Sequence, residues 1–133
     1  MDPARPGRPP TVLVVDDDVD LLDLTVRTLA RAGWTVLRAD GGDTALELAG
    51  EVEVDVVLTD VVMPGTDGLA LVEVLRRARP ALPVVFTTGH DDPAIHAAVA
   101  ATGAPLVPKP YTPATLRTVL HEALAGDDGE VAG

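Results

Sequence analysis

TVLVVDDDVDLLDLTVRTLARAG, residues 11–33, is the segment from which the architecture of this chain can be predicted. Its first five residues are mostly valine, as in strands that are buried on both faces of a sheet. Apolar residues then recur at helical spacing, at Leu22, Val26, Leu29 and Ala30. Gly33 suits the position just beyond a helix end. The segment therefore predicts a buried strand followed directly by an amphipathic helix.

The same order of strand and helix recurs along the rest of the chain. Four more apolar runs, at 34–39, 54–59, 83–88 and 104–108, are each followed by a helical pattern. The first two of these helices are predicted at about 43–50, where Thr44 and Glu47 suggest a capping box, and at about 68–78. The last two begin at Asp92-Pro93 and Thr112-Pro113, each a capping residue before a proline. Such alternation predicts an α/β fold with a doubly wound, five-stranded parallel sheet.

Composition predicts one folded domain with a short extension at each end. The 133 residues suffice for a single core, and 47% of them are hydrophobic. Residues 1–10 contain four prolines and predict a disordered Pro/Arg-rich arm, while the acidic, glycine-rich residues 126–133 predict a flexible tail. The domain itself is expected at 11–125. No apolar run approaches the ~20 residues that span a bilayer, and cysteine is absent, so we expect no membrane partner and a cytoplasmic location.

The net charge of -11 restricts the partners that the chain can bind directly. It would repel nucleic-acid phosphates and anionic lipid, and the arginines do not form a basic stripe. We therefore expect no direct nucleic-acid binding. An acidic chain suits a cation site or a basic protein partner, although excess carboxylates that only keep the protein soluble explain the charge equally well.

Several polar residues stand at the predicted carboxyl ends of the strands, where ligands bind in doubly wound sheets. They are Asp16, Asp17, Asp18, Asp60, Thr87, Thr88 and Lys109. Carboxylates that converge there would repel one another unless a cation or an ammonium lies among them. Mg²⁺ takes such oxygen ligands and keeps several waters. Lys109 is the only lysine, and its compact ammonium suits a narrow site better than a planar guanidinium would.

Two simpler explanations of the aspartates deserve comparison. An aspartate after a strand often caps the next helix, which accounts for Asp18 or Asp20 but not for Asp60, because a loop and not a helix follows Asp60. Asp16, Asp18 and Asp20 also have the spacing of an EF-hand calcium loop. That loop needs glycine and glutamate at the positions that Leu21 and Arg27 occupy, so this interpretation fails.

Four segments resemble the receiver domain of two-component response regulators. They are VLVVDDD (12–18), VVLTDVVMPGTDG (56–68), VVFTTG (84–89) and VPKPYT (107–112), and they occur in the order of that family. The resemblance covers about residues 11–125 and implies a flavodoxin-like (βα)5 fold with strand order 2-1-3-4-5. It also implies a signalling phosphoacceptor that assists its own phosphorylation and dephosphorylation and is not otherwise an enzyme. The phosphoryl group would come from a histidine kinase or a histidine phosphotransfer protein.

The resemblance further implies roles for individual residues at the metal and phosphoryl site. Asp60 would be the phosphoacceptor. Asp16 and Asp17 would hold Mg²⁺, or alternatively Mn²⁺, together with Asp60 and the carbonyl of Val62. Phosphoryl transfer to a carboxylate requires neutralisation of charge on the phosphoryl oxygens, and a metal ion with a lysine beside it supplies that charge. The lysine of the family corresponds here to Lys109.

Other family positions concern the switch that follows phosphorylation. Thr88 would form a hydrogen bond to the phosphoryl group and draw the loop after it inward. This movement would repack a face of the domain that binds an unknown downstream protein or forms a homodimer. Leu106 stands where Tyr or Phe is common in the family. The sequence therefore does not support a switch in which an aromatic side chain at this position rotates after phosphorylation. Val62, Gly89 and His90 would flank the site, and Val62 and His90 occupy positions that tune the phosphate lifetime. The bond to Pro110 would be cis, as in ~5% of X-Pro bonds.

Two alternative functions remain open at this point. A degenerate receiver would bind partners without phosphorylation. A phosphatase of the haloacid-dehalogenase type would use Asp16 and Asp18 as its Asp-x-Asp motif, but it would leave Asp60 without a role. His96 and His121 are expected on helix surfaces, and Tyr111 and Trp34 are expected to serve packing.

Overall fold

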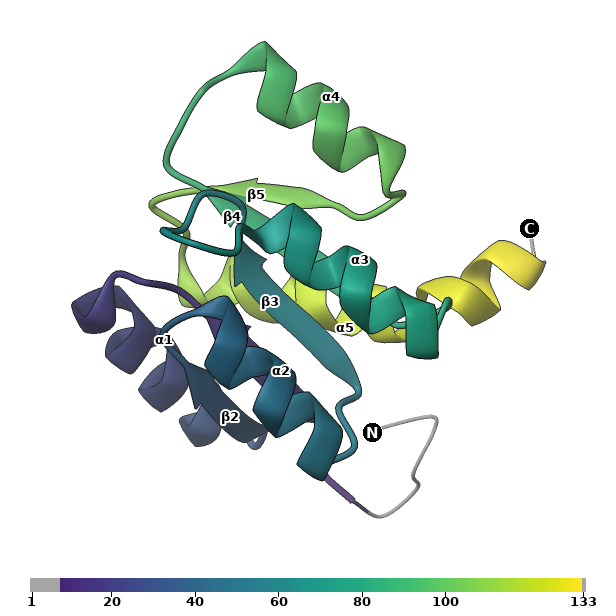
Figure 1. Ribbon diagram of the computed structural model, residues 1–133. Helices are drawn as coiled ribbons and strands as arrows, with labels where there is room; N and C mark the ends of the chain where they lie inside the picture. The colour runs from purple at the N-terminus through teal and green to yellow at the C-terminus, as the bar shows by residue number, and fades with distance from the viewer. Residues whose placement is uncertain (1–7, 133) are drawn as a thin grey trace.

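The computed structural model describes residues 8–132, with side chains described as far as Gly126. Five strands and five helices alternate along the chain (Figure 1). The strands are β1 Thr11–Val15, β2 Thr35–Ala39, β3 Val56–Asp60, β4 Val84–Thr88 and β5 Leu106–Pro108. The helices are α1 Val19–Arg31, α2 Gly42–Glu51, α3 Gly68–Ala78, α4 Pro93–Ala101 and α5 Pro113–Ala132.

All five strands lie in one parallel sheet in the order β2-β1-β3-β4-β5. This confirms the predicted doubly wound architecture and its strand order. Every residue of β1, β3 and β4 is buried, whereas the edge strand β2 is partly exposed. Valine-rich central strands fit this arrangement because both of their faces are covered by helices.

The helices divide the core into two layers. One layer packs α1 and α5 against the sheet around Leu22, Leu29, Leu116 and Leu120. The other packs α2, α3 and α4 against the opposite face, and Phe86 lies in it fully buried. Because each layer buries aliphatic side chains against the same central strands, the carboxyl ends of those strands are held at fixed positions.

Helix starts were predicted well except at one place. Asp18, Asp67 and Asp92 cap α1, α3 and α4, and each side chain accepts a hydrogen bond from a backbone N–H of the first turn. The capping box predicted from Thr44 is wrong. α2 begins earlier, at Gly42, with no side-chain cap. A Cβ on residue 42 would lie 2.8 Å from the Thr66 Cβ, so glycine lets the first residue of α2 pack closely against the loop after β3.

The two predicted extensions lie partly outside the described residues. Of the arm at 1–10, residues 1–7 are not described, and the carbonyl of Pro10 accepts a hydrogen bond from Thr35 N at 2.9 Å. α5 runs to Ala132, past residue 125 where the domain was expected to end. The flexibility predicted for 126–133 stays a prediction, since side chains beyond Gly126 are not described. No helix in the described part of the chain has the length and apolar character needed to cross a membrane.

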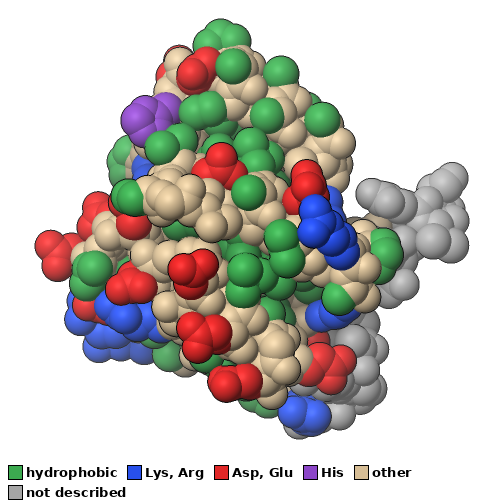
Figure 2. Space-filling view, in the orientation of Figure 1, with side chains coloured by type: hydrophobic (Ala, Val, Ile, Leu, Met, Phe, Trp, Pro, Cys, Tyr) green, Lys and Arg blue, Asp and Glu red, His purple; other side chains and the backbone are tan. Residues whose placement is uncertain are grey.

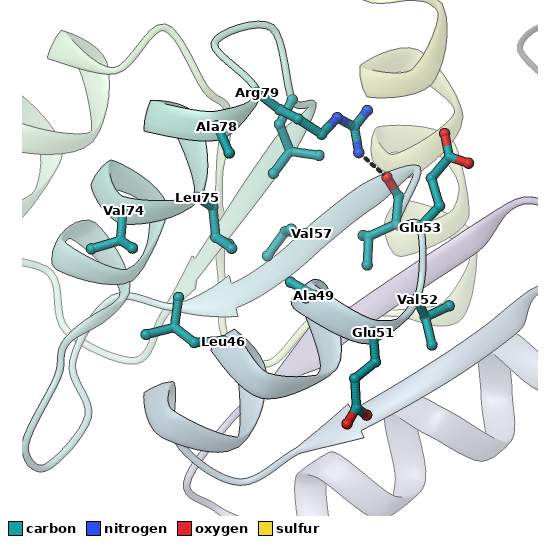
Figure 3. A pocket seen from close by; sticks show the side chains of 13 residues that line it. Leu46, Ala49, Glu51, Val52, Glu53, Val57, Val74, Leu75, Ala78 and Arg79 are labelled. Carbon is teal, nitrogen blue, oxygen red and sulfur yellow. Dashed lines mark hydrogen bonds between the residues drawn. The ribbon is translucent and has the colours of Figure 1, made fainter.

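An apolar hollow of about 550 Å³ lies at the amino end of the sheet, between α2 and α3 (Figure 3). Leu46, Val57 and Leu75 line it, and Arg79 donates a hydrogen bond to the carbonyl of Val54 at its edge. The polar strand-end residues singled out from the sequence lie at the other end of the strands.

Candidate functional site

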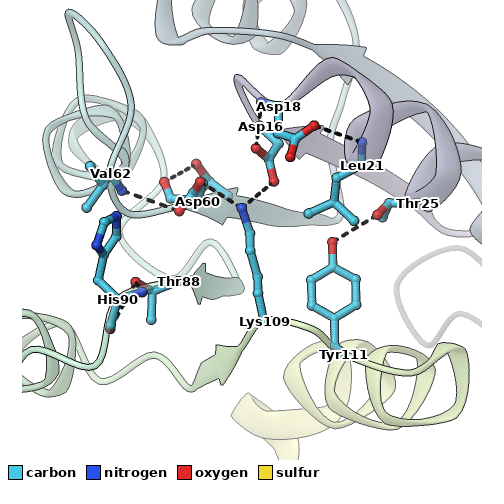
Figure 4. A network of polar contacts seen from close by, with 11 residues as sticks. Asp16, Asp18, Leu21, Thr25, Asp60, Val62, Thr88, His90, Lys109 and Tyr111 are labelled. Carbon is cyan, nitrogen blue, oxygen red and sulfur yellow. Dashed lines mark hydrogen bonds and ion pairs between the residues drawn. The ribbon is translucent and has the colours of Figure 1, made fainter.

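The carboxyl ends of β1, β3 and β5 bring together two carboxylates and one ammonium (Figure 4). Asp16 follows β1, Asp60 ends β3 and Lys109 follows β5. The side chains of Asp16 and Asp60 are almost wholly buried, with 3% and 6% of each residue exposed. Lys109 Nζ lies 2.9 Å from Asp16 Oδ2 and 2.9 Å from Asp60 Oδ2. A single ammonium therefore joins two carboxylates from distant parts of the chain.

A third carboxylate completes an acidic cluster at the solvent side. One carboxylate oxygen from each of Asp16, Asp17 and Asp60 lies within 4.8 Å of the other two, and Asp17 is exposed. Oxygen ligands of an octahedral Mg²⁺ lie ~2.1 Å from the ion, and hence up to ~4.2 Å apart. The separations of the three oxygens, all within 4.8 Å, are close to this spacing, so the three acids suit one shared ion.

The charges of the cluster do not cancel. Three carboxyl groups face one ammonium, so their formal charges sum to an excess of two negative charges. Burial raises the pKa of Asp60 above its ordinary value, and the ammonium of Lys109 opposes the rise without cancelling it, while the charge of Asp16 adds to it. Burial acts to lower the pKa of Lys109, but the hydrogen bonds to Asp60 and Asp16 and the charges of these two carboxylates together outweigh burial and raise this pKa. A divalent cation would offset the excess charge, so this donor set fits Mg²⁺.

Backbone groups hold the two buried acids in place. The N–H of Asp18 donates to Asp16 Oδ1 at 2.9 Å, and the N–H of Val62 lies 3.4 Å from Asp60 Oδ1. Val62 is exposed and directly follows the turn out of β3. Asp18 itself is not in the cluster, because its carboxylate accepts a hydrogen bond from Leu21 N at 3.2 Å and caps α1.

Gly68 is a site residue that sequence reasoning missed. A Cβ on residue 68 would lie only 2.1 Å from the backbone carbonyl oxygen of Asp60, so only glycine fits. The hydroxyl of Thr59 donates to the same carbonyl oxygen at 3.0 Å. The first residue of α3 thus packs directly against the backbone of Asp60. A glycine at the start of a helical pattern was the available signal, because glycine is a poor helix former.

Thr88 and the loop after β4 form one side of the site. Thr88 is buried, and its hydroxyl accepts a hydrogen bond from His90 N at 3.0 Å and lies 3.3 Å from the His90 carbonyl oxygen. The hydroxyl is therefore engaged within its own loop and not with Asp60. The side chains of His90 and Val62 belong to the loops that follow β4 and β3 (Figure 4). A Cβ on Gly89 would only touch the Lys109 side chain, at 3.9 Å.

The segment after β5 connects the site to the helices. The Lys109–Pro110 peptide bond is cis. Beyond it, the hydroxyl of Tyr111 lies 2.8 Å from the hydroxyl of Thr25 on α1 (Figure 4). Burial raises the pKa of Tyr111, and the hydrogen bond to Thr25 opposes the rise. Leu106 is half-buried at the start of β5, opposite Phe86 of β4.

The remaining aromatic and histidine residues lie elsewhere. The rings of Trp34 and His121 pack with their centroids 4.9 Å apart. His96 is exposed on α4, with its Nε2 3.4 Å from a carboxylate oxygen of Asp91.

Comparison with protein families gives one match over most of the chain. A family model described as the response regulator receiver domain matches residues 12–121. Among curated proteins, the DNA-binding transcriptional regulator NtrC of Escherichia coli K12 is 42% identical over 103 residues, which is 75% of this chain and 22% of the relative. The sensor kinase CckA of Brucella abortus is 36% identical over 121 residues, 89% of this chain and 13% of the relative. The chain thus spans less than a quarter of the length of these relatives.

Solved structures give the same result at the level of the fold. The receiver domain of NtrX from Brucella abortus has a TM-score of 0.79 and 33% identity, and the match covers 85% of this chain and 97% of that one. The chemotaxis protein CheY4 of Vibrio cholerae has a TM-score of 0.81 and 30% identity, with 86% and 98% covered.

Proposed function

The chain belongs to the family of response regulator receiver domains, and on this basis we propose that Asp60 accepts a phosphoryl group with Mg²⁺ as cofactor. The donor is a histidine kinase or a histidine phosphotransfer protein. The family is a signalling domain and not a classical enzyme. One observation carries the proposal: the Asp60 carboxylate is buried beside Lys109 Nζ at 2.9 Å and within a group of three acids suited to a divalent ion.

Phosphoryl transfer at this site needs positioning and charge neutralisation more than acid–base chemistry. An oxygen of the Asp60 carboxylate attacks phosphorus, a new O–P bond forms, and the bond from phosphorus to the donor nitrogen or oxygen breaks. No general base is required, because the nucleophile reacts as a carboxylate. The ammonium of Lys109 already contacts Asp60 Oδ2, so it is placed to bind a phosphoryl oxygen after transfer.

The proposed Mg²⁺ ligands are the carboxylates of Asp16, Asp17 and Asp60 and the carbonyl of Val62. Mn²⁺, which also takes oxygen ligands, is an alternative ion. The ion supplies positive charge to the phosphoryl oxygens when bound. The excess of two negative charges in the cluster supports this assignment, because it makes a divalent cation the natural counterion.

We propose that Thr88 couples phosphorylation to a change of surface. The phosphoryl group adds charge and acceptor oxygens at Asp60. The Thr88 hydroxyl would leave its contacts with His90 and bond a phosphoryl oxygen, which draws the loop 89–92 inward and repacks α4 against β5. The face formed by α4, β5 and α5 would then bind a downstream protein or a second copy of the chain. Leu106 cannot act as a rotating aromatic switch, so the Thr88 loop carries this change alone.

The domain of residues 11–125 is the proposed working unit, and the cytoplasm is its proposed location. Val62 and His90, which follow β3 and β4, are proposed to set how long the phosphoryl group remains. The phosphatase alternative would need Asp18 beside Asp16. The capping role of Asp18 at α1 disfavours it.

Incubation with a small phosphodonor, acetyl phosphate, and Mg²⁺ tests the proposal by intact mass. We expect the wild type to gain one phosphoryl group and Asp60→Ala to gain none. Asp18→Asn, which keeps a capping side chain outside the cluster, serves as the matched control and should be modified like the wild type. An unmodified wild type would support a receiver that works by binding alone. Modification of Asp60→Ala would place the acceptor elsewhere.

A further inference from the structure

A cavity of about 400 Å³ lies next to the phosphoryl site, between the loop after β4, α4 and β5. Thr88, Leu106, Pro108 and the Lys109 side chain form its walls, and Asp91 and His96 stand at its edge. Its volume falls in the range of ~300–1,000 Å³ that is common for binding pockets. Because Thr88 forms part of the wall, any movement of Thr88 changes the shape of the cavity.

The described part of the chain offers no aromatic side chain to fill this cavity. The sequence contains one Trp, one Tyr and one Phe. Phe86 is fully buried in the core, Tyr111 is hydrogen-bonded to Thr25, and Trp34 packs beside His121. Leu106 is half-buried and already forms a wall. The space is therefore available to a side chain from another molecule.

The chemistry of the walls favours a flat, amphipathic side chain. Leu106, Pro108 and the methylene groups of Lys109 provide apolar surface, while Thr88 and the backbone of the loop provide polar atoms. An aromatic ring with a polar end, such as tyrosine, matches this combination. Aromatic side chains that insert into such pockets carry much of the binding energy of protein interfaces.

The charges around the cavity favour a basic partner. The Asp91 side chain is fully exposed, and Asp92 next to it is also exposed. The ammonium of Lys109 is already bound by two carboxylates. Figure 2 shows acidic and histidine side chains at one end of an otherwise mostly apolar and uncharged region over α4. Repulsion between chains of net charge -11 disfavours a second copy as the occupant.

We propose that this cavity binds an aromatic side chain of the downstream protein, presented on a segment that carries Lys or Arg beside the aromatic residue. The proposal rests on the proposed function for its role in signalling, since it names the partner chemistry of the face that phosphorylation would repack. The partner supplies the aromatic ring that the chain does not place there itself. Movement of Thr88 changes the cavity wall and thereby the affinity.

Three short peptides with blocked ends test the proposal on the unphosphorylated wild type by NMR titration. Their sequences are Arg-Tyr-Arg, Arg-Ala-Arg and Glu-Tyr-Glu. We expect the first to bind at least tenfold more tightly than either of the others and to shift the amide signals of Gly89, His90 and Leu106. Equal binding of Arg-Tyr-Arg and Arg-Ala-Arg, or shifts confined to other regions, would overturn the proposal. This comparison needs no variant of the chain.

Two pairs of variants localise the binding. Leu106→Tyr should place a ring of the chain itself in the cavity and weaken Arg-Tyr-Arg at least tenfold, whereas Val52→Tyr, which adds a ring at an exposed position at the end of α2, should bind like the wild type. Asp91→Asn should weaken it several-fold, whereas Glu47→Gln, a matched loss of one exposed charge on α2, should not. Unchanged binding by Leu106→Tyr would exclude the cavity. Phosphorylation is not needed in these measurements, so a failure here leaves phosphoryl transfer to Asp60 untouched, and the reverse also holds.

Discussion

At the scale of single residues, the site concentrates charge in a place that burial makes unfavourable. Asp16 and Asp60 are both more than nine-tenths buried, and they share the ammonium of one lysine. Removing carboxylates from water costs free energy, and the attraction to the one ammonium that both carboxylates share does not fully offset this cost. The raised pKa of Asp60, due first to burial, expresses this cost. The arrangement suits a carboxylate that exchanges partners during function.

Asp60→Asn should stabilise the domain at neutral pH in the absence of divalent ions. Because the pKa of Asp60 is raised on folding, the folded state binds its proton more tightly, and ionisation of Asp60 lowers the free energy of unfolding. This penalty is absent below the ordinary carboxyl range and grows as the pH rises until Asp60 is fully ionised in the folded state. We expect a gain in the free energy of unfolding at pH 7 that shrinks as the pH falls through the ordinary carboxyl range, measured by urea denaturation.

Asp18→Asn is the control for this measurement, because Asp18 is exposed and asparagine also caps helices. Its effect should be small throughout this pH range. Loss of stability in Asp60→Asn at pH 7, or a gain that does not depend on pH, would show that the Lys109 contact outweighs the cost of burial.

At the scale of elements, the end of β3 and the start of α3 are fitted to each other through Gly68. The backbone of α3 approaches the Asp60 carbonyl so closely that any side chain would have to displace the helix or the strand. The N–H of Gly68 also donates to the carbonyl of Val61 at 2.9 Å. The loop between β3 and α3, which contains Val62, is thereby closed at both ends. Packing of α3 thus helps to position the proposed acceptor.

Gly68→Ala should therefore destabilise the domain even though alanine is the better helix former. We expect a loss of roughly 2–3 kcal/mol, because an added Cβ at 2.1 Å from a carbonyl oxygen forces the backbone to shift. Gly50→Ala in α2 is the matched control, since nothing lies within 4 Å of a Cβ there, and it should stabilise by up to ~1 kcal/mol. Thermal and urea unfolding measure both. Equal effects of the two substitutions would contradict the close approach.

At the scale of the whole molecule, the acidic cluster ties the first and third βα units together at one edge of the sheet. Asp16 and Asp17 follow β1, and Asp60 ends β3, the neighbouring strand. An ion bound by all three would be present only in the folded state, because the unfolded chain does not hold these carboxylates together. Binding of the ion should then raise the stability of the entire domain.

Mg²⁺ should raise the free energy of unfolding by ~1.4 kcal/mol at ten times its dissociation constant. Asp17→Asn should remove most of this effect, because Asp17 is an exposed member of the cluster with little part in the core. Asp43→Asn removes an exposed acidic residue on α2 and should leave it intact. Denaturation with Mg²⁺ and with NaCl at equal ionic strength distinguishes specific binding of the ion from general screening of the net charge. Equal stabilisation by both salts would mean screening of the net charge and no specific site.

Much of the fold followed from local patterns in the sequence. Valine-rich runs, helical spacing of apolar residues and Asp or Thr before helices are short-range signals, and apart from the end of α5 they located the strands and helices to within a few residues. They also indicated the carboxyl edge of the sheet as the place to look for a site. The failed capping box at Thr44 shows the limit, since α2 begins at Gly42, which lies close to Thr66, a residue of another βα unit.

The geometry of the site could not be read from the chain in this way. Lys109 reaches Asp60 across a separation of 49 residues, and the close approach of Gly68 and the engagement of Thr88 with its own loop depend on how strands and helices pack. The order of residues determined which elements form and which chemical groups stand at their ends. Only the packed sheet determined the distances and burial of those groups, because both result from contacts between segments far apart in the sequence.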